Sequence, residues 1–141
     1  MFACNESFTT PGDDSWYDLS LTPSARRAAQ DGFNLSTDAL RWFADQYVDP
    51  ALRQDPDVSP LYASLADLGP VRLTVGTLDP FLDDNLFLYS RLVAAGNEAE
   101  IAVHPGGIHG FNALPIPISR EANQGAEEFI RSRTRDAGAS S

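Results

Sequence analysis

The sequence predicts an α/β fold in which helices pack on a parallel sheet. Two short apolar runs, at residues 71–76 and 99–104, have the length and composition of buried strands. Strands that are almost continuously apolar are typical of parallel sheets covered on both faces. Each run precedes a segment with helical spacing of apolar residues, so the order from residue 71 to 134 is that of a βαβα unit with a right-handed crossover.

The segment before the first strand is predicted to hold one helix and a long loop. Residues 1–33 are polar and rich in turn residues, which indicates an irregular connection. Ser36 or Thr37 is a candidate N-cap for a helix of about three turns that ends before Pro50. We expect its apolar residues to serve in packing: Leu40, Trp42, Phe43 and Tyr47. Residues 49–69 contain three prolines and are predicted as loop, anchored by Leu61, Tyr62, Leu65 and Leu68.

The remaining elements are predicted from the spacing of apolar residues and from the turn residues that end each segment. A helix over 82–95 ends at Gly96-Asn97, a typical C-terminal signal, and buries Leu82, Leu86, Tyr89, Leu92 and Val93. The second strand ends at Pro105-Gly106-Gly107. A last helix over 119–134 buries Ala122, Ala126, Phe129 and Ile130. Residues 136–141 are predicted as a disordered, frayed tail, which leaves residues 34–135 as the folded core segment.

Composition excludes several classes of function. With 141 residues, 43% hydrophobic and 21% charged, the chain is long enough for one domain with a core. A net charge of −10 argues against a nucleic-acid partner, because binding phosphates requires clustered basic residues. No apolar run approaches the roughly 18 residues of a membrane span, and no signal peptide is visible, so we expect a cytoplasmic protein.

The residue counts also limit the chemistry. All ten basic residues are arginine, which excludes Schiff-base and Ser-Lys chemistry. Cys4 is the single cysteine, so an internal disulfide is impossible, and together with two histidines it is too few for a Cys/His zinc site. We therefore expect neither a metal nor a cofactor.

An acid and a histidine follow the two predicted strands. Asp79 lies three residues past the first strand and His109 five past the second. Because the carboxyl ends of parallel strands meet at one edge of the sheet, the two side chains are expected within hydrogen-bonding reach. An acid so placed accepts the Nδ1–H of an imidazole and fixes its tautomer.

Simpler interpretations exist for each of these residues. Asp-Pro after a strand is often only a turn or a helix N-cap, and a loop histidine is often inert. Asp83 and Asp84 are expected to be an acidic first turn favoured by the helix dipole, since they lack the glycine and the spacing of a calcium loop. His104 follows the strand pattern rather than a site pattern.

Four segments together resemble one family: Ser59-Pro60-Leu61-Tyr62-Ala63, residues 75–84, residues 89–96, and His104-Pro105-Gly106-Gly107-Ile108-His109-Gly110-Phe111. Residues 34–134 resemble the C-terminal part of the hormone-sensitive-lipase-like carboxylesterases, which are α/β-hydrolases. The resemblance implies the last two parallel strands of that sheet with their helices, and makes Asp79 the triad acid and His109 the triad base. Phe81 stands where the family usually has leucine.

The rest of a serine hydrolase site is missing from the sequence. No G-x-S-x-G nucleophile elbow and no HGG-type oxyanion segment occurs in the 141 residues. The chain is therefore interpreted as a truncated, C-terminal fragment of a serine carboxylesterase, inactive alone and acting on a small ester only when the other half completes it. A non-catalytic binding or assembly module and one half of a split hydrolase remain open alternatives. We also expect self-association, or a partner, at the exposed sheet edge.

Overall fold

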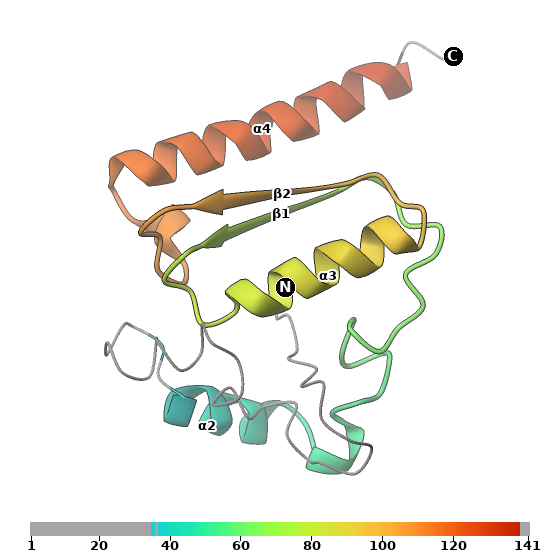
Figure 1. Ribbon diagram of the computed structural model, residues 1–141, viewed down its shortest axis with the longest axis vertical. Coiled ribbons are helices and arrows are strands. Elements are labelled where there is room, and N and C mark those ends of the chain that lie inside the picture. Colours follow the sequence, from blue (N-terminus) through green and yellow to red (C-terminus); the bar gives the residue numbers. More distant parts are fainter. Residues whose placement is uncertain (1–34, 36, 139–141) are drawn as a thin grey trace.

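A computed structural model describes residues 35 and 37–138 (Figure 1). Within them the elements follow in the order α2 (Thr37–Tyr47), η1 (Pro50–Leu52), β1 (Val71–Gly76), α3 (Leu82–Ala94), β2 (Ala99–His104), η2 (Phe111–Ala113) and α4 (Pro117–Gly138). The segment 1–33 and the candidate N-cap Ser36 lie outside the described residues.

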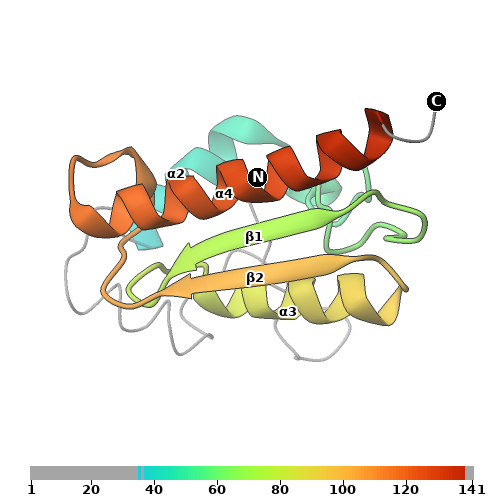
Figure 2. The ribbon, with the colours of Figure 1, turned by 90° about the horizontal axis from the view of Figure 1, so that it is seen from above.

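The described sheet has two parallel strands, with Val71 opposite Ala99 at one end and Gly76 opposite His104 at the other. Helix α3 covers one face of this sheet and α4 covers the other (Figures 1 and 2). The α/β fold class is therefore confirmed, and both strands have the predicted bounds.

The main core lies between the sheet and α3. Its buried residues come from the loop before β1, from β1 itself and from α3: Leu61, Leu65, Leu73, Leu88 and Leu92. The loop is also fixed by Asn97, whose side chain donates to the Leu65 carbonyl and accepts the Leu68 N–H. Gly96 precedes it with φ +84°, so the predicted glycine stop of α3 is confirmed.

The buried faces of the helices differ from the prediction. On α3 the buried stripe runs through Asp84, Leu88 and Leu92, whereas Leu86 and Val93 are exposed. On α4, Ala122 is buried but Ile130 is exposed. The physical reason is that two strands cover only a narrow stripe of each helix, so apolar residues flanking that stripe remain in solvent.

Helix α2 and the loop behind it also depart from expectation. The buried stripe of α2 is Leu40 and Ala44, while Trp42, Phe43 and Tyr47 are more than half exposed. Both sets have helical spacing, so periodicity alone does not tell which one packs. Leu68 was predicted as an anchor, but its side chain is exposed and only its backbone is tied to Asn97.

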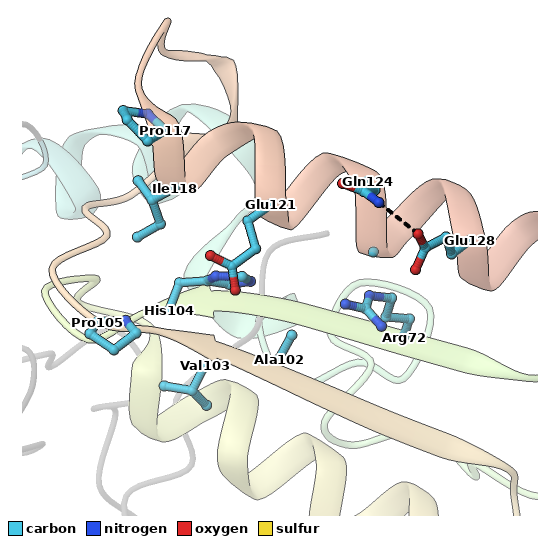
Figure 3. A pocket seen from close by; sticks show the side chains of 11 residues that line it. Arg72, Ala102, Val103, His104, Pro105, Pro117, Ile118, Glu121, Gln124 and Glu128 are labelled. Atoms are coloured by element: carbon cyan, nitrogen blue, oxygen red, sulfur yellow. Dashed lines mark hydrogen bonds between the residues drawn. The ribbon is translucent and has the colours of Figure 1, made fainter.

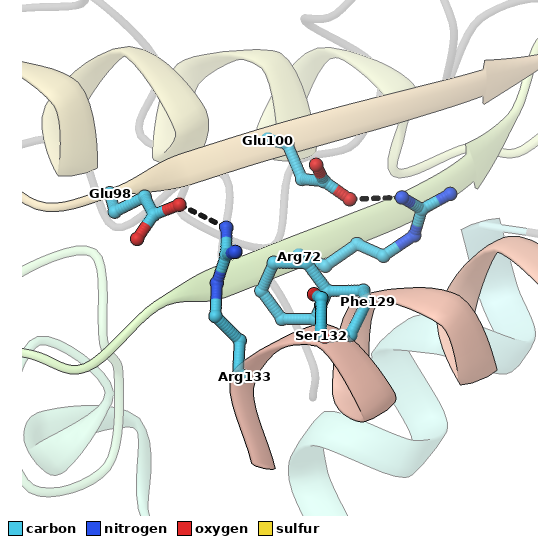
Figure 4. Close-up of polar contacts among 6 residues, drawn as sticks. All are labelled: Arg72, Glu98, Glu100, Phe129, Ser132 and Arg133. Atoms are coloured by element: carbon cyan, nitrogen blue, oxygen red, sulfur yellow. Dashed lines mark hydrogen bonds and ion pairs between the residues drawn. The ribbon is translucent and has the colours of Figure 1, made fainter. Parts of the chain in front are cut away.

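Two ion pairs join these elements, one between the strands and one between α4 and the start of β2. Arg72 on β1 pairs with Glu100 on β2, and Arg133 on α4 pairs with Glu98 just before β2 (Figure 4). The Arg133 guanidinium also lies 5.1 Å from the Phe129 ring centroid. The helix extends to Gly138, beyond the predicted end at residue 134, and residues 139–141 lie outside the described part.

The loops that follow β1 and β2 are joined through their backbones. The Thr77 N–H donates to the His104 carbonyl at 3.0 Å, and the Leu78 N–H donates to the Gly107 carbonyl at 2.9 Å. Gly76 and Gly107 approach so closely that a Cβ on Gly76 would lie 2.0 Å from the Gly107 oxygen. Glycine is therefore required at position 76, because any side chain there meets backbone that has no room to move.

We predict that Gly76→Ala destabilises the fold by about 3 kcal/mol or more, at the upper end of the cost of overpacking. Gly69→Ala is the matched control, because a Cβ at Gly69 has no atom within 4 Å. It should change the free energy of unfolding by less than about 0.5 kcal/mol. Urea unfolding of the three proteins checks this, and equal midpoints for the two variants would contradict it.

Candidate active site

Asp79 and His109 form the centre of the candidate site. The His109 Nδ1 lies 3.1 Å from Asp79 Oδ2 and 3.3 Å from Oδ1. The Asp79 side chain is 9% exposed and the His109 side chain 37% exposed, so the acid is covered while the imidazole reaches the surface. The predicted hydrogen-bonding reach is confirmed. The catalytic role of each residue stays a prediction.

The turn after β1 holds Asp79 in place. Its backbone N–H donates to the Gly76 carbonyl at 3.2 Å, and its Oδ1 accepts the Phe81 N–H at 2.9 Å. The simpler interpretation of Asp-Pro as a turn is therefore also correct. One carboxylate closes the turn that begins α3 and contacts the imidazole, which fixes its orientation from two sides.

The turn after β2 holds His109. Gly110 adopts φ +71°, a conformation that favours glycine, and the Phe111 N–H donates to the Ile108 carbonyl at 3.1 Å. Phe111 is buried, and its carbonyl accepts the Ser119 hydroxyl at 2.6 Å. The histidine turn is thus fastened to the start of α4.

Phe81 completes the surroundings of the imidazole. Its ring meets the His109 ring in a T-shaped arrangement, with centroids 5.3 Å apart and an interplanar angle of 66°. The sequence analysis gave Phe81 no role and missed this contact. The only available signal was the departure from the family pattern two residues after the acid.

Asp84 carries the largest electrostatic perturbation near the site. Burial raises the pKa of its carboxyl from 3.8 to about 7, and the charges of Asp83 and, to a smaller extent, Asp79 act in the same direction. Its Oδ2 is buried without a hydrogen-bond partner in the described structure. Asp83 and Asp84 do form the acidic first turn of α3, as expected, but the Asp84 side chain is buried.

The arrangement supports proton transfer at the second imidazole nitrogen. With Nδ1–H donating to the Asp79 carboxylate, the neutral His109 ring carries its lone pair on Nε2. That nitrogen is then able to accept a proton, and the carboxylate stabilises the imidazolium that results. The pair therefore has the parts of a general base and its orienting acid.

A separate hollow of about 720 Å³ lies between β2 and α4, and Arg72, His104 and Glu121 are among its lining residues (Figure 3). Neither Asp79 nor His109 lines it. Arg72 Nε and His104 Nε2 are buried and have no hydrogen-bond partner within the described part of the chain. His104 is the last residue of β2, as the strand pattern predicted.

Within residues 35 and 37–138, no group of three or more His, Cys, Asp or Glu side chains is arranged to hold a metal ion. None of the helices in this part of the chain combines the length and the hydropathy needed to cross a membrane.

Comparison with known proteins places the site in context. Residues 8–113 match the family model described as alpha/beta hydrolase fold. The ethyl acetate hydrolase of Pseudomonas putida is 35% identical over 105 residues, which are 73% of this chain. Among solved structures, the carboxylesterase EstE1 from a metagenomic library is 25% identical with a TM-score of 0.78 over 92% of this chain. A hyperthermophilic esterase from the archaeon Pyrobaculum calidifontis is 27% identical with a TM-score of 0.76 over 80% of this chain.

The matches cover only part of each relative. The chain spans 32% of the Pseudomonas putida protein, 42% of EstE1 and 37% of the Pyrobaculum calidifontis esterase. Because the chain covers less than half of each relative, we propose their activity for it instead of assigning it.

We predict that Asp84 makes stability fall as pH rises. Unfolded chains lose this proton near pH 3.8, whereas the folded chain holds it to about pH 7, so between these values the folded state binds more protons. The loss is complete above pH 7 and amounts to at most about 4 kcal/mol at 1.36 kcal/mol per unit. Asp84→Asn removes the titration and should be more stable than wild type at pH 8, with a difference that shrinks towards pH 4.

Urea unfolding at pH 4, 6 and 8 measures this difference. Asp83→Asn is the control, since it removes one neighbouring charge and leaves the buried carboxyl. It should show a smaller pH-dependent gain. The same pH dependence in wild type and Asp84→Asn would refute the assignment.

Proposed function

The chain belongs to the alpha/beta hydrolase fold family, and we propose that it supplies the acid and the base of a serine carboxylesterase site. Its resemblance to hormone-sensitive-lipase-like hydrolases is confirmed by the family match and the related esterases. In this proposal Asp79 is the acid and His109 is the base. The contact between His109 Nδ1 and the Asp79 carboxylate carries the proposal.

The proposed reaction is acyl transfer through a serine. His109 Nε2 takes the serine hydroxyl proton as the serine oxygen attacks the ester carbonyl. The imidazolium then gives that proton to the leaving alkoxide, and an alcohol departs as the acyl-serine forms. Water repeats the sequence and releases the carboxylic acid. Asp79 keeps Nδ1 protonated throughout, so the imidazole presents the correct nitrogen in both halves.

The proposed substrate is a small carboxylic ester. Ethyl acetate hydrolase is the name of the related Pseudomonas putida protein, and the similar solved structures include a carboxylesterase and an esterase. The His109 side chain is 37% exposed, and in this proposal a small ester reaches the imidazole without opening the core.

The serine and the oxyanion donors are proposed to come from outside the printed sequence. Its 141 residues contain no G-x-S-x-G and no HGG segment. Loss of one oxyanion donor alone costs about 3–4 kcal/mol of transition-state stabilisation, and loss of the nucleophile costs more. We therefore propose that these 141 residues alone do not turn over esters, and that a companion segment with a nucleophile elbow completes the site.

We predict esterase activity only when the two parts are combined. The chain alone should show no turnover of p-nitrophenyl acetate above that of its own His109→Ala variant. Co-expression with the N-terminal half of a related esterase, carrying HGGG and the nucleophile elbow, should restore hydrolysis. Asp79→Asn in the chain should then lower kcat by about 10⁴, because the imidazole adopts the wrong tautomer.

Two results would overturn parts of this proposal. Turnover by the chain alone that His109→Ala abolishes would show that another residue serves as nucleophile. A stable complex without any turnover would favour a non-catalytic assembly module. Gly69→Ala, which lies before β1 and away from both loops, is the control for expression and assembly.

We further propose that the companion pairs with the free edge of β1. In the described sheet β1 pairs only with β2, although its Leu73 and Val75 side chains are buried like those of an interior strand. Unpaired N–H and C=O groups along an apolar strand form a template for another chain. We predict that the chain self-associates or unfolds in part when alone and becomes a defined heterodimer with the N-terminal half.

Sedimentation and amide exchange of the chain, alone and with the N-terminal half, test whether the companion pairs with β1. Protection of the β1 amides should rise when the companion is added. A cooperative monomer whose Leu73 and Val75 amides are strongly protected without any partner would contradict it.

A further inference from the structure

We propose that Phe81 is a positioning residue for His109, and that it couples helix α2 to the acid–base pair. The proposed function gives this role its catalytic consequence, but the positioning itself is a property of the chain. Three observations carry it: a hydrogen bond to the acid, a ring contact with the base, and a buried support on α2.

Phe81 touches both members of the pair. Its backbone N–H donates to Asp79 Oδ1 at 2.9 Å, in a buried environment. Its ring packs against the His109 ring at 5.3 Å between centroids, in the T-shaped geometry that aromatic pairs prefer. One residue therefore orients the carboxylate through its backbone and the imidazole through its side chain.

The Phe81 side chain also packs against helix α2. The residue is 5% exposed and packs with Leu40 of α2, and the partly buried Leu35 joins the same cluster. A ring fixed on one side by α2 cannot swing away from His109 without opening a cavity between them. This gives Leu40, one of the buried residues of α2, a role near the site that its sequence position does not reveal.

The Phe81 ring restrains the imidazole in a direction that a hydrogen bond does not. A hydrogen bond at Nδ1 fixes the position of that atom but not the tilt of the ring plane about it. A flat aromatic neighbour limits that tilt, whereas leucine at this position offers an irregular, flexible surface. We therefore expect Phe81→Leu to leave the fold intact and to loosen the histidine.

The test is NMR of the chain with labelled histidine, alone and in the presence of the unlabelled N-terminal half of a related esterase. The chain has only two histidines, so a His104→Gln variant assigns both sets of signals. Wild type should show cross-relaxation between the Phe81 and His109 rings and a downfield Nδ1–H resonance. Phe81→Leu should lose the Nδ1–H resonance to exchange and change the His109 ring shifts, with those of His104 unchanged. Phe81→Tyr, which keeps the ring, should restore the resonance.

A matched control separates positioning from general loosening. Phe129→Leu makes the same substitution on α4, where the ring contacts Arg133 and not the site. It should leave the His109 signals as in wild type. If Phe81→Leu keeps the wild-type Nδ1–H resonance and ring shifts, or if Phe129→Leu removes them equally, the proposal is wrong.

Activity of the two-part enzyme then separates this proposal from the proposed function. Phe81→Leu should lower kcat about tenfold with KM unchanged, since a misaligned base affects the transition state and not ester binding. If the combined enzyme is inactive while the NMR results hold, the esterase proposal fails and the positioning role stands. If kcat is unchanged while the complex is active, Phe81 does not position the base.

Discussion

The close backbone approach of Gly76 and Gly107 is the constraint on which the candidate site depends. A Cβ on Gly76 would lie 2.0 Å from the Gly107 oxygen, so the two backbone segments touch without side chains between them. That contact allows the Leu78 N–H to reach the Gly107 carbonyl and the Thr77 N–H to reach the His104 carbonyl. Two separate loops thereby become one rigid unit, and the acid and the histidine that they carry come within hydrogen-bonding distance.

Burial determines the charge of one acidic residue beside these two loops, Asp84. Asp79, Asp83 and Asp84 lie within six residues of one another at the start of α3, and three full charges there would repel. Burial raises the pKa of Asp84 to about 7, so near neutrality this carboxyl carries only part of a charge. The Asp79 carboxylate lies within hydrogen-bonding distance of the Phe81 N–H and of His109 Nδ1.

The sequence predicted the strands, the main helices and the meeting of Asp79 and His109. It did not predict which side chains surround them. The strands were predicted with correct bounds because apolar runs between turn residues are a local signal. The meeting of Asp79 and His109 followed from parallel strand ends. The exposure of Leu86 and Ile130, the burial of Asp84 and the ring contact of Phe81 depend on residues distant in sequence, and periodicity carries no information about them.

The most direct test of this account combines amide exchange with imidazole NMR in wild type and Gly107→Ala. A Cβ at Gly107 would lie 2.9 Å from the Phe111 ring and 3.0 Å from Gly76 Cα, which strains the joint less severely than a change at Gly76. The account predicts that the Thr77 and Leu78 amides and the His109 Nδ1–H lose protection together, while the Leu73 amide keeps its own. If the His109 Nδ1–H resonance persists after the Thr77 and Leu78 amides lose protection, the hydrogen bonds between the two loops are not what holds Asp79 and His109 together.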